Sequence, residues 1–513
     1  MLEGIDTKIQ RGVFPHNAEE FVVEYPKPNP VKSRKVMLLT GVQGTTRFLI
    51  HNNSATNLRR ALMERVYHVE ANGQLQRPPQ PVPGIFATLM GSRDKIAHMV
   101  GRLTPMSREQ FVATRPVDKR KIYEKAYESL QQTPPCLQDS RVSGAFVKCE
   151  KINATKKPDP APRIIQPRSP RYNIEVGRYL VVAEHAIYQA IDELWGSPTV
   201  MKGYNVEQIG DIVATKWGEF TDPVALGLDA SRFDQHVSVE ALQFEHGLYN
   251  DIFGSGELAS LLRRQLDNRG LAHADDATFV YRKPGSRMSG DMNTALGNII
   301  IMCLLTYYFC EVRQVRASLL NNGDDCTLIF EREDIEIVLE GLHEWFLDYG
   351  FNIVQEPIVD VLEKIEFCQM HPVFVNGSWK MVRNFWPSLS KDALSIRSRT
   401  TTELRQWMHC VGKCGLAVAS GVPVQQEYYL YFVRNGLKGR RMRDVETLEG
   451  RCGLTWFSRG LAANPTPIGD DTRVSFYRAF GIDPAMQMAM EAEYQELTFS
   501  TNAPKAEDLF IRE

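Results

Sequence analysis

Two consecutive acidic residues stand at the tip of a predicted β-hairpin, and this feature constrains the fold more than any other. Apolar runs at 317–320 and 326–330 flank Asn321-Asn322-Gly323-Asp324-Asp325. Asn-Gly between two apolar runs is a strong hairpin signal, and glycine tolerates the positive φ of a tight turn. The sequence therefore predicts that Asp324 and Asp325 project together from a hairpin.

A second predicted strand supplies another carboxylate. Residues 224–229 form a short apolar run that ends at Asp229, and Asp234 follows shortly after. Carboxylates are hard oxygen ligands suited to Mg²⁺, and two ions roughly 3.5–4 Å apart can serve an attacking and a leaving oxygen. If this strand lies beside the hairpin, Asp229, Asp324 and Asp325 would form a two-metal site for phosphoryl transfer.

Composition is that of a folded protein with more than one lobe. The chain has 513 residues, of which 43% are hydrophobic and 24% charged, with a net charge of −2. A near-neutral total is compatible with a local basic channel. Nine scattered cysteines favour a reducing compartment, and His409, Cys410 and Cys414 are interpreted as packing residues rather than a zinc site. The longest apolar stretch, 299–310, is interpreted as a buried helix rather than a membrane span.

Residues 148–178 combine many basic side chains with five prolines. Proline disrupts helix interiors, so the whole segment is predicted to be extended. Taken alone, it is more simply explained as a solvated basic loop. Further on, positions 237, 241, 244, 248 and 252 have helical spacing, residues 294–312 are predicted to form a helix, and the chain beyond about 395 is mostly helical in pattern.

The order of these motifs resembles that of the RNA-dependent RNA polymerases of small positive-strand RNA plant viruses, the tombusvirus-like family, which are related to the flavivirus and hepatitis C group. The resemblance covers residues 146–370. It rests on the basic motif from Phe146-Val147-Lys148 to Pro162-Arg163-Ile164-Ile165, on the palm motifs Asp229-Ala-Ser-Arg-Phe-Asp234, 289–298 and Gly323-Asp324-Asp325, and on the primer-grip motif Glu366-Phe367-Cys368-Gln369.

The resemblance implies an α+β right-hand polymerase with an antiparallel palm sheet, closed by fingertips. The expected fingers, with an N-terminal arm, comprise 1–220, and 236–287 return to the fingers. The palm comprises 221–235, which carry the first metal motif, and 288–395. The thumb comprises 396–513.

The resemblance also implies roles for individual residues. Asp229, Asp324 and Asp325 would be catalytic and bind Mg²⁺, with Mn²⁺ as a substitute; Asp325 is expected to contribute mainly charge. The expected nucleotide-binding residues are Asp234, Ser289, Thr294, Asn298, Lys156, Lys157 and Arg163, with Asp234 and Asn298 paired near the sugar. The expected RNA-binding residues are Lys148, Arg168, Gly290 and Cys368.

Some alternatives stay open at this stage. Lys364 is a candidate general acid but abuts the grip motif, and for Arg168 and Arg171 a solvated basic loop is an equal alternative. A reverse transcriptase would share the palm, but Gly323 before the aspartates and polar Asp234 at the sugar position favour ribonucleotide chemistry. A non-catalytic scaffold could keep the fold, but all the expected metal ligands are present.

The resemblance implies template RNA, nascent RNA and ribonucleoside triphosphates as partners, with host factors as further candidates. The expected location is a membrane-associated replication complex in the host cytoplasm. Because no membrane anchor is predicted within 1–513, the anchor is expected from an upstream region or from a separate viral replication protein.

Overall fold

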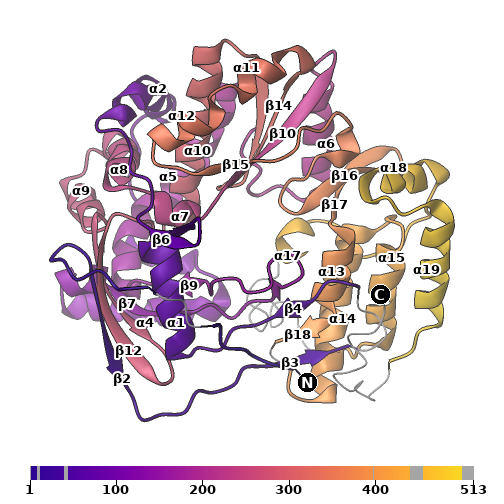
Figure 1. The fold of residues 1–513 in the computed structure, drawn as a ribbon, viewed down its shortest axis with the longest axis horizontal. Coiled ribbons are helices and arrows are strands. Elements are labelled where there is room, and N and C mark those ends of the chain that lie inside the picture. The colour runs from indigo at the N-terminus through magenta and orange to yellow at the C-terminus, as the bar shows by residue number, and fades with distance from the viewer. Residues whose placement is uncertain (1, 9–11, 40–43, 397, 440–453, 500–513) are drawn as a thin grey trace.

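A computed structural model describes the chain except for residues 1, 9–11, 40–43, 397, 440–453 and 500–513. Helices and strands mix throughout, which confirms the predicted α+β class (Figure 1). Within the described residues, three sheets have more than two strands, and the remaining strand pairs are hairpins or short two-stranded pairings. The two-stranded pairs are β4 (Phe48–Leu49) with β8 (Ile152–Asn153), β5 (Val69–Ala71) with β6 (Gln74–Gln76), and β16 (Met370–Val375) with β17 (Ser378–Arg383).

A four-stranded antiparallel sheet carries the predicted acidic motifs. Its strand order is β13 (Ala317–Asn321), β14 (Asp325–Glu331), β10 (Pro223–Ala230) and β15 (Ile353–Gln355). The hairpin prediction is confirmed by β13 and β14, and the strand that ends near Asp229 is confirmed by β10. Both faces of β10 are covered, since Val224, Ala225 and Leu226 are all buried. This explains why the strand has a continuous apolar run instead of alternation.

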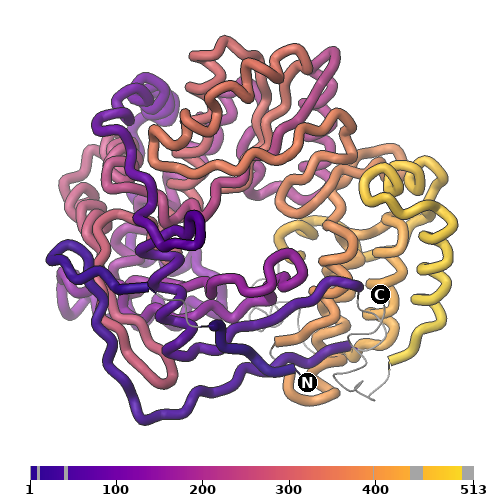
Figure 2. Tube along the Cα trace, viewed as in Figure 1, coloured from indigo at the N-terminus to yellow at the C-terminus, as the bar shows by residue number. Residues whose placement is uncertain are grey.

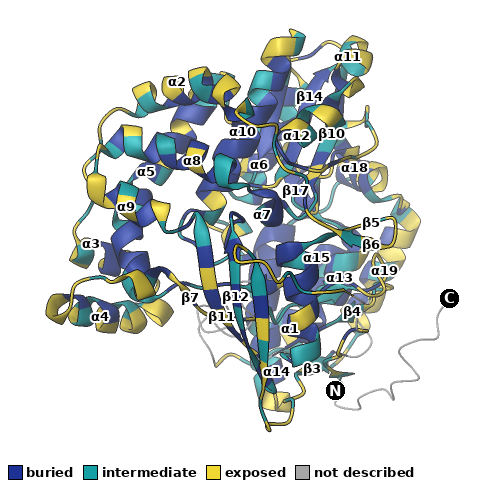
Figure 3. Cartoon of the chain, turned by 60° about the vertical axis from the view of Figure 1, so that its left-hand side comes forward, coloured by how far each residue is buried: buried dark blue, intermediate teal, exposed yellow. Residues whose placement is uncertain are grey.

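A five-stranded sheet joins segments that lie far apart in the sequence. Its order is β2 (Phe21–Pro26), β12 (Ala277–Pro284), β11 (Asp267–His273), β7 (Val142–Val147) and β9 (Ile164–Ile165). Buried and less buried residues alternate along β11 and β12, as expected for a sheet with one face on the core (Figure 3). The N-terminal arm, the basic segment and residues 267–284 therefore belong to one structural unit.

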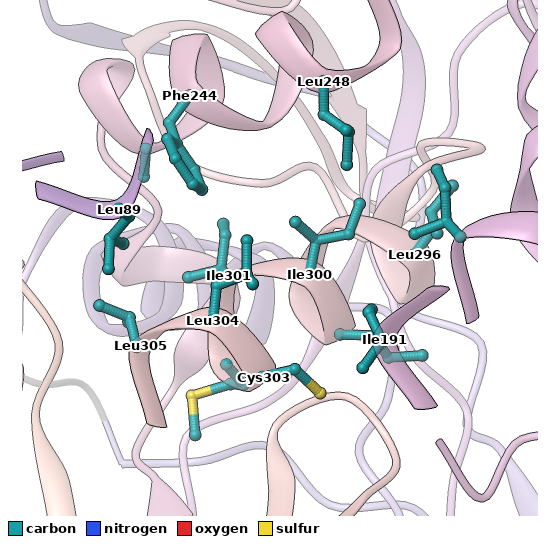
Figure 4. Close-up of a cluster of buried hydrophobic side chains, with 14 of the residues drawn as sticks. Leu89, Ile191, Phe244, Leu248, Leu296, Ile300, Ile301, Cys303, Leu304 and Leu305 are labelled. Atoms are coloured by element: carbon teal, nitrogen blue, oxygen red, sulfur yellow. The ribbon is translucent and has the colours of Figure 1, made fainter. Parts of the chain in front are cut away.

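Helix α10 (Thr294–Arg313) forms the centre of the largest hydrophobic core. Ile300, Ile301 and Leu304 lie among side chains from α5 (Pro170–Trp195), α8 (Val239–Phe253) and the segment before α2 (Met90–Val100) (Figure 4). This confirms the predicted buried helix. Among the described helices, α10 alone is long and apolar enough to cross a membrane, but 72% of its most apolar window is buried inside the protein.

The basic segment differs from its prediction at its C-terminal end. Residues 148–169 form loops and short strands, as predicted. From Pro170 onward the segment is helical, because α5 (Pro170–Trp195) begins there. Proline is tolerated at the first helical position, where its missing N–H would have no partner, and Ser169 caps the helix. Pro170 therefore starts a helix instead of interrupting one, and Arg171 and Arg178 are helical residues.

The N-terminal segment reaches the C-terminal part of the chain (Figure 2). A third sheet has the order β1 (Leu2–Glu3), β3 (Lys35–Leu38), β18 (Leu394–Ser395), all antiparallel. Lys151 adds a contact, since its Nζ donates to the carbonyl oxygen of Lys391 and lies 5.6 Å from the ring centroid of Trp407. Two independent contacts thus join the N-terminal half to the C-terminal helices.

The helical prediction beyond about 395 is confirmed by α14, α15, α17, α18 and α19. Cys410 and Cys414 are buried in the hydrophobic cluster of that region, as their interpretation as packing residues requires. The α-helices not yet bounded are α1 (Ala55–Leu62), α3 (Arg108–Ala113), α4 (Val117–Gln132), α6 (Val206–Trp217), α7 (Phe233–His236), α9 (Gly256–Arg263), α11 (Ile335–Leu339), α12 (Leu342–Asp348), α13 (Phe385–Asp392), α14 (Thr401–Ala419), α15 (Gln425–Asn435), α17 (Leu454–Phe457), α18 (Asp470–Phe480) and α19 (Pro484–Glu496).

Candidate active site

The β13–β14 turn is built by its own side chains. Gly323 has φ 94°, a conformation that L-residues rarely adopt. Buried Asn321 accepts from the Gly323 N–H at 3.1 Å and donates to the Gly323 carbonyl at 2.8 Å. The turn thereby fixes the backbone immediately before Asp324 and Asp325.

The strand register brings the first aspartate to the same place. Asp229 on β10 is the cross-strand partner of Asp325 on β14. The side chain of Asp324 is exposed at the turn, but nearby protein atoms displace part of its hydration. This partial desolvation and the negative charge of Asp229 raise the pKa of Asp324. Burial, with the charge of Asp324, raises the pKa of Asp325 to about 6. Each raised pKa reflects an environment that would be stabilised by added positive charge.

The three carboxylates are donors of the type that Mg²⁺ prefers. None of them has a Lys, Arg or His ion-pair partner within the described ranges, and no group of three acidic, His or Cys side chains there converges into a ready cage. Mg²⁺ usually takes only one or two protein carboxylates and completes its shell with water and substrate phosphates. The donor set therefore fits Mg²⁺ bound together with a phosphate-bearing substrate.

The turn at Phe367–Met370 docks against the acidic hairpin through Cys368. Asn322 Nδ2 contacts Cys368 Sγ at 3.2 Å, and Cys368 hydrogen-bonds to Asp325. Cys368 and Gln369 both have positive φ, 53° and 59°, so the turn is held in a strained conformation. Cys368 therefore links the β13–β14 hairpin to the grip turn and helps to orient Asp325. Its predicted contact with RNA stays a prediction.

Asp234 and Asn298 meet as the family resemblance implied. Asn298 Nδ2 donates to Asp234 Oδ1 at 2.9 Å, from the first turns of α10 to the start of α7. Within the described residues, Oδ2 of Asp234 accepts no hydrogen bond. Burial raises the pKa of Asp234, which Asn298 and Arg287 partly oppose. One carboxylate oxygen therefore remains available to a ligand hydroxyl.

A group of basic side chains includes one, Arg163, that lies near these carboxylates. Arg163, 59% exposed, is close enough to influence both Asp324 and Asp234 electrostatically. Burial and neighbouring cations lower the pKa of Arg65 to about 10, and burial, Arg232 and Arg65 lower that of Lys157. For Arg65 and Lys157, burial is the larger cause and neighbouring cations add to it, so a bound anion would stabilise their charged forms. We call Arg65, Lys157, Arg163 and Arg232 the basic cluster.

Comparison with known proteins agrees with this geometry. Residues 22–502 match the family model described as viral RNA dependent RNA polymerase. The chain belongs to this family. It is 44% identical over 97% of its length to the RNA-directed RNA polymerase of Turnip crinkle virus, and 43% identical over 98% to that of Carnation mottle virus. It is 46% identical over 91% to the Maize chlorotic mottle virus polymerase.

The aligned part covers 63%, 65% and 48% of those three relatives, so the chain spans about half to two thirds of their length. The predicted resemblance to tombusvirus-like polymerases is confirmed over nearly the whole chain, beyond the 146–370 on which it was based. The acidic hairpin, the Asp234–Asn298 pair and the basic cluster all lie within the residues that match the family model.

Arg168 has a different role in this polymerase-family chain from the predicted RNA contact. It is 2% exposed and forms an ion pair with Asp291. Its guanidinium also donates to the Asn268 side chain at 2.6 Å and to the Ser140 carbonyl. A fully engaged, buried guanidinium cannot reach RNA, so Arg168 is a structural residue. Arg171 is likewise engaged, with Asp139.

Gly290 lies against the basic segment. A Cβ at this position would lie 2.6 Å from the carbonyl oxygen of Gln166 and 2.7 Å from Pro167 Cα, so glycine is required by close approach of the basic segment. Ser289 Oγ donates to the Ile164 carbonyl and accepts from the Gln166 N–H. These contacts join the second palm motif to the basic motif, and the template contact at Gly290 and the nucleotide contact at Ser289 stay predictions.

The remaining predicted residues have identifiable surroundings. Thr294 donates to the carbonyl oxygens of Met288 and Asp291, and so braces the start of α10. Lys148 pairs with Glu150, which also contacts Arg163. Lys156 is exposed and electrostatically close to Glu356. Lys364 donates to the Ala479 carbonyl at 3.4 Å, which does not favour it as the general acid.

Arg65 and Arg232 are members of the basic cluster that were not predicted as site residues. Arg65 lies in a π-helix, Met63–Tyr67, that follows α1, and Arg232 adopts φ 53° between the two aspartates of the first palm motif. A non-glycine residue held at positive φ next to a functional motif is itself a functional signal, but it is visible only in the structure. The position of Arg232 between Asp229 and Asp234 was the available sequence clue.

Proposed function

We propose that this chain is an RNA-directed RNA polymerase that extends RNA by two-metal-ion nucleotidyl transfer during replication of a positive-strand RNA plant virus. The observation that carries the proposal is the cross-strand pairing of Asp229 with Asp325, with Asp324 at the adjoining turn. Mg²⁺, or Mn²⁺ as a substitute, held there would promote ionisation of a 3′-hydroxyl and neutralise charge on the departing pyrophosphate.

The chain's own residues would bind and orient the substrates. Asp229 and Asp324 supply the main metal-binding charge, and Asp325, bonded to Cys368, contributes charge from the second position. The basic cluster would hold the triphosphate, because cations already crowded together gain stabilisation from an anion. Asp234 would accept the ribose 2′-hydroxyl at its open oxygen, which is the group that distinguishes ribonucleotides from deoxyribonucleotides.

We propose the closed right-hand arrangement for the architecture. The five-stranded sheet would be the core of the fingers, the four-stranded sheet the palm, and the helices after 395 the thumb. The contact of Lys151 with Trp407 supports fingertips that reach the thumb, and β3 pairs with β18 directly before the thumb begins. Because α6 packs beside β17 and on the Ala225–Ile329 face of the palm sheet, we assign 206–220 to the palm instead of the fingers.

We further propose that the chain acts in a membrane-associated complex in the host cytoplasm, together with a viral replication protein and host factors. The burial of α10 within the protein core supports a membrane contact made by something other than that helix.

Substituting Asp234 tests the proposed sugar contact and the reaction together. The purified chain should extend a short RNA with ribonucleotides and Mg²⁺, with or without a primer. Asp234→Ala should lower the ratio of kcat/KM for a ribonucleotide over its deoxyribonucleotide by about tenfold or more, since a hydrogen bond to a charged group is worth about 1.5–3 kcal/mol. An unchanged ratio would remove Asp234 from sugar recognition. A parent chain that prefers deoxyribonucleotides would contradict the proposed function itself.

Arg163 tests the triphosphate contact. Arg163→Ala should raise KM for nucleotide or lower kcat, because it removes positive charge next to Asp324. The dependence of RNA affinity on salt should change by less than about one unit of log–log slope, the effect expected for one lost phosphate contact. If template affinity fell strongly while nucleotide kinetics stayed normal, Arg163 would belong to the template path.

A further inference from the structure

Arg287 and Glu245 form an ion pair inside the protein, next to the proposed sugar contact. Both side chains have 0% exposure, and Arg287 Nη2 lies 2.6 Å from Glu245 Oε2. A buried pair is costly to desolvate and is often no more stabilising than apolar residues of the same volume. Stability alone therefore does not explain the ion pair, and the side chains that it orients do.

Arg287 closes a ring with Asp234 and Asn298. Its backbone N–H donates to the Asp234 carbonyl at 2.8 Å, and its side-chain Nε donates to Asn298 Oδ1 at 3.0 Å. Asn298 Nδ2 then donates to Asp234 Oδ1 at 2.9 Å. An Asn amide can face its neighbours in two ways, but a guanidinium can only donate. Arg287 therefore fixes the Asn298 amide with its NH₂ group toward Asp234.

Glu245 in turn fixes Arg287. Its Oε1 accepts from Tyr249 Oη at 2.8 Å and from Asn293 Nδ2 at 2.7 Å, which leaves Oε2 for the guanidinium. Gly297, directly before Asn298, makes room for the pair. A Cβ there would lie 2.4 Å from both Arg287 Nη2 and Glu245 Oε1. Helix α10 thus has glycine, a poor helix former, where the ion pair packs against it.

We propose that Arg287 and Glu245 are positioning residues for ribose selection: they hold Asn298 so that Asp234 presents its free oxygen to the 2′-hydroxyl. This inference rests on the proposed role of Asp234 in recognising the sugar. Neither residue touches the nucleotide, and both act through the Asn298 amide.

The test replaces both charges at once, so that neither is left buried alone. In Arg287→Met/Glu245→Gln, the introduced amide oxygen keeps an acceptor for Tyr249 and Asn293, while Asn298 loses its orienting donor. The ratio of kcat/KM for ribonucleotide over 2′-deoxyribonucleotide should fall about tenfold, the equivalent of one hydrogen bond of about 1.4 kcal/mol. Discrimination against 3′-deoxyribonucleotide should stay unchanged, because the proposed contact is specific to the 2′ position.

Two further variants separate positioning from general damage. When the double substitution is added to the Asn298→Ala variant, the 2′ ratio should fall no further. The effects of substitutions that act through the same group, here the Asn298 amide, do not add. A matched control is Arg473→Met/Glu491→Gln, which removes an ion pair of 14% and 9% exposure between α18 and α19. This control should leave the 2′ selectivity at the parent value even if it lowers thermal stability.

Gly297→Ala provides a test that removes no charge. It should displace the ion pair and lower the 2′ ratio, and it decides the matter if the double variant does not fold. The positioning role is wrong if the double variant and Gly297→Ala both keep a 2′ ratio within about twofold of the parent while Asn298→Ala lowers it. A twofold change is well below the change of about tenfold expected for one lost hydrogen bond. If Asp234→Ala and Asn298→Ala themselves leave the ratio unchanged, the proposed sugar contact is wrong instead.

Discussion

Asp324→Asn is expected to abolish RNA synthesis while leaving RNA binding nearly intact. The substitution keeps the size of the side chain at the β13–β14 turn. It removes one negative charge from a site where desolvation by the surrounding protein and the charge of Asp229 raise the pKa of Asp324. Metal-ion catalysis supplies several kcal/mol of transition-state stabilisation, so the rate should fall by about a thousandfold or more. Single-nucleotide incorporation at saturating Mg²⁺ measures this loss.

The control for Asp324→Asn is binding of a labelled RNA template, which should be unchanged because no phosphate contact is removed. Asp229→Asn should behave in the same way, since Asp229 faces the same hairpin. Asp325→Asn should lower activity less, because Asp325, which is hydrogen-bonded to Cys368, is proposed to contribute mainly charge. An Asp324→Asn variant that keeps more than a few per cent of activity would argue against the two-metal assignment, in which each ligand is worth several kcal/mol.

Arg168→Ala is expected to destabilise the whole protein. It leaves Asp291, which is 8% exposed, without its cation and also removes donors to Asn268 and Ser140. Breaking a buried ion pair by removing one partner typically costs about 3–5 kcal/mol, a large fraction of the stability of a folded domain. Urea or thermal unfolding should show a clearly lowered midpoint.

Arg163→Ala is the matched control, because Arg163 lies in the same basic segment but has a side chain that is 59% exposed. It should affect nucleotide kinetics and leave the unfolding midpoint close to the parent value. The original RNA-binding hypothesis for Arg168 predicts the opposite pattern: normal stability and a salt slope reduced by about one unit. That result would restore Arg168 to the RNA path.

The contrast between Arg163 and Arg168 shows where sequence reasoning ends. Both arginines lie in the same proline-rich basic segment, and residue type alone cannot say which of them is buried. The partner that buries Arg168 is Asp291, 123 residues further along the chain. A long-range pairing of this kind is a property of the tertiary fold, which local composition does not encode.

Local signals were reliable where the physics is local. Turn chemistry at Asn322-Gly323 and the continuous apolar run before Asp229 predicted the hairpin and the buried strand. Helical spacing predicted α8, and the long apolar stretch at 299–310 predicted α10. The pairing of Asp234 with Asn298 came from the family resemblance, and the Arg287–Glu245 pair behind it was not foreseen, because Glu245 has no motif of its own.

Pairing of β3 with β18 has a consequence for synthesis of the chain. Leu38 pairs with Leu394, so 394 − 38 = 356 residues separate the partners. At translation rates of roughly 5–20 residues per second, β3 waits on the order of tens of seconds for this neighbour. During that time it offers an unpaired strand edge, which is a template for misassociation. Pairing of β3 with β18 should therefore be slow and largely post-translational, and newly made chains should depend on chaperones until residues 394–395 have emerged.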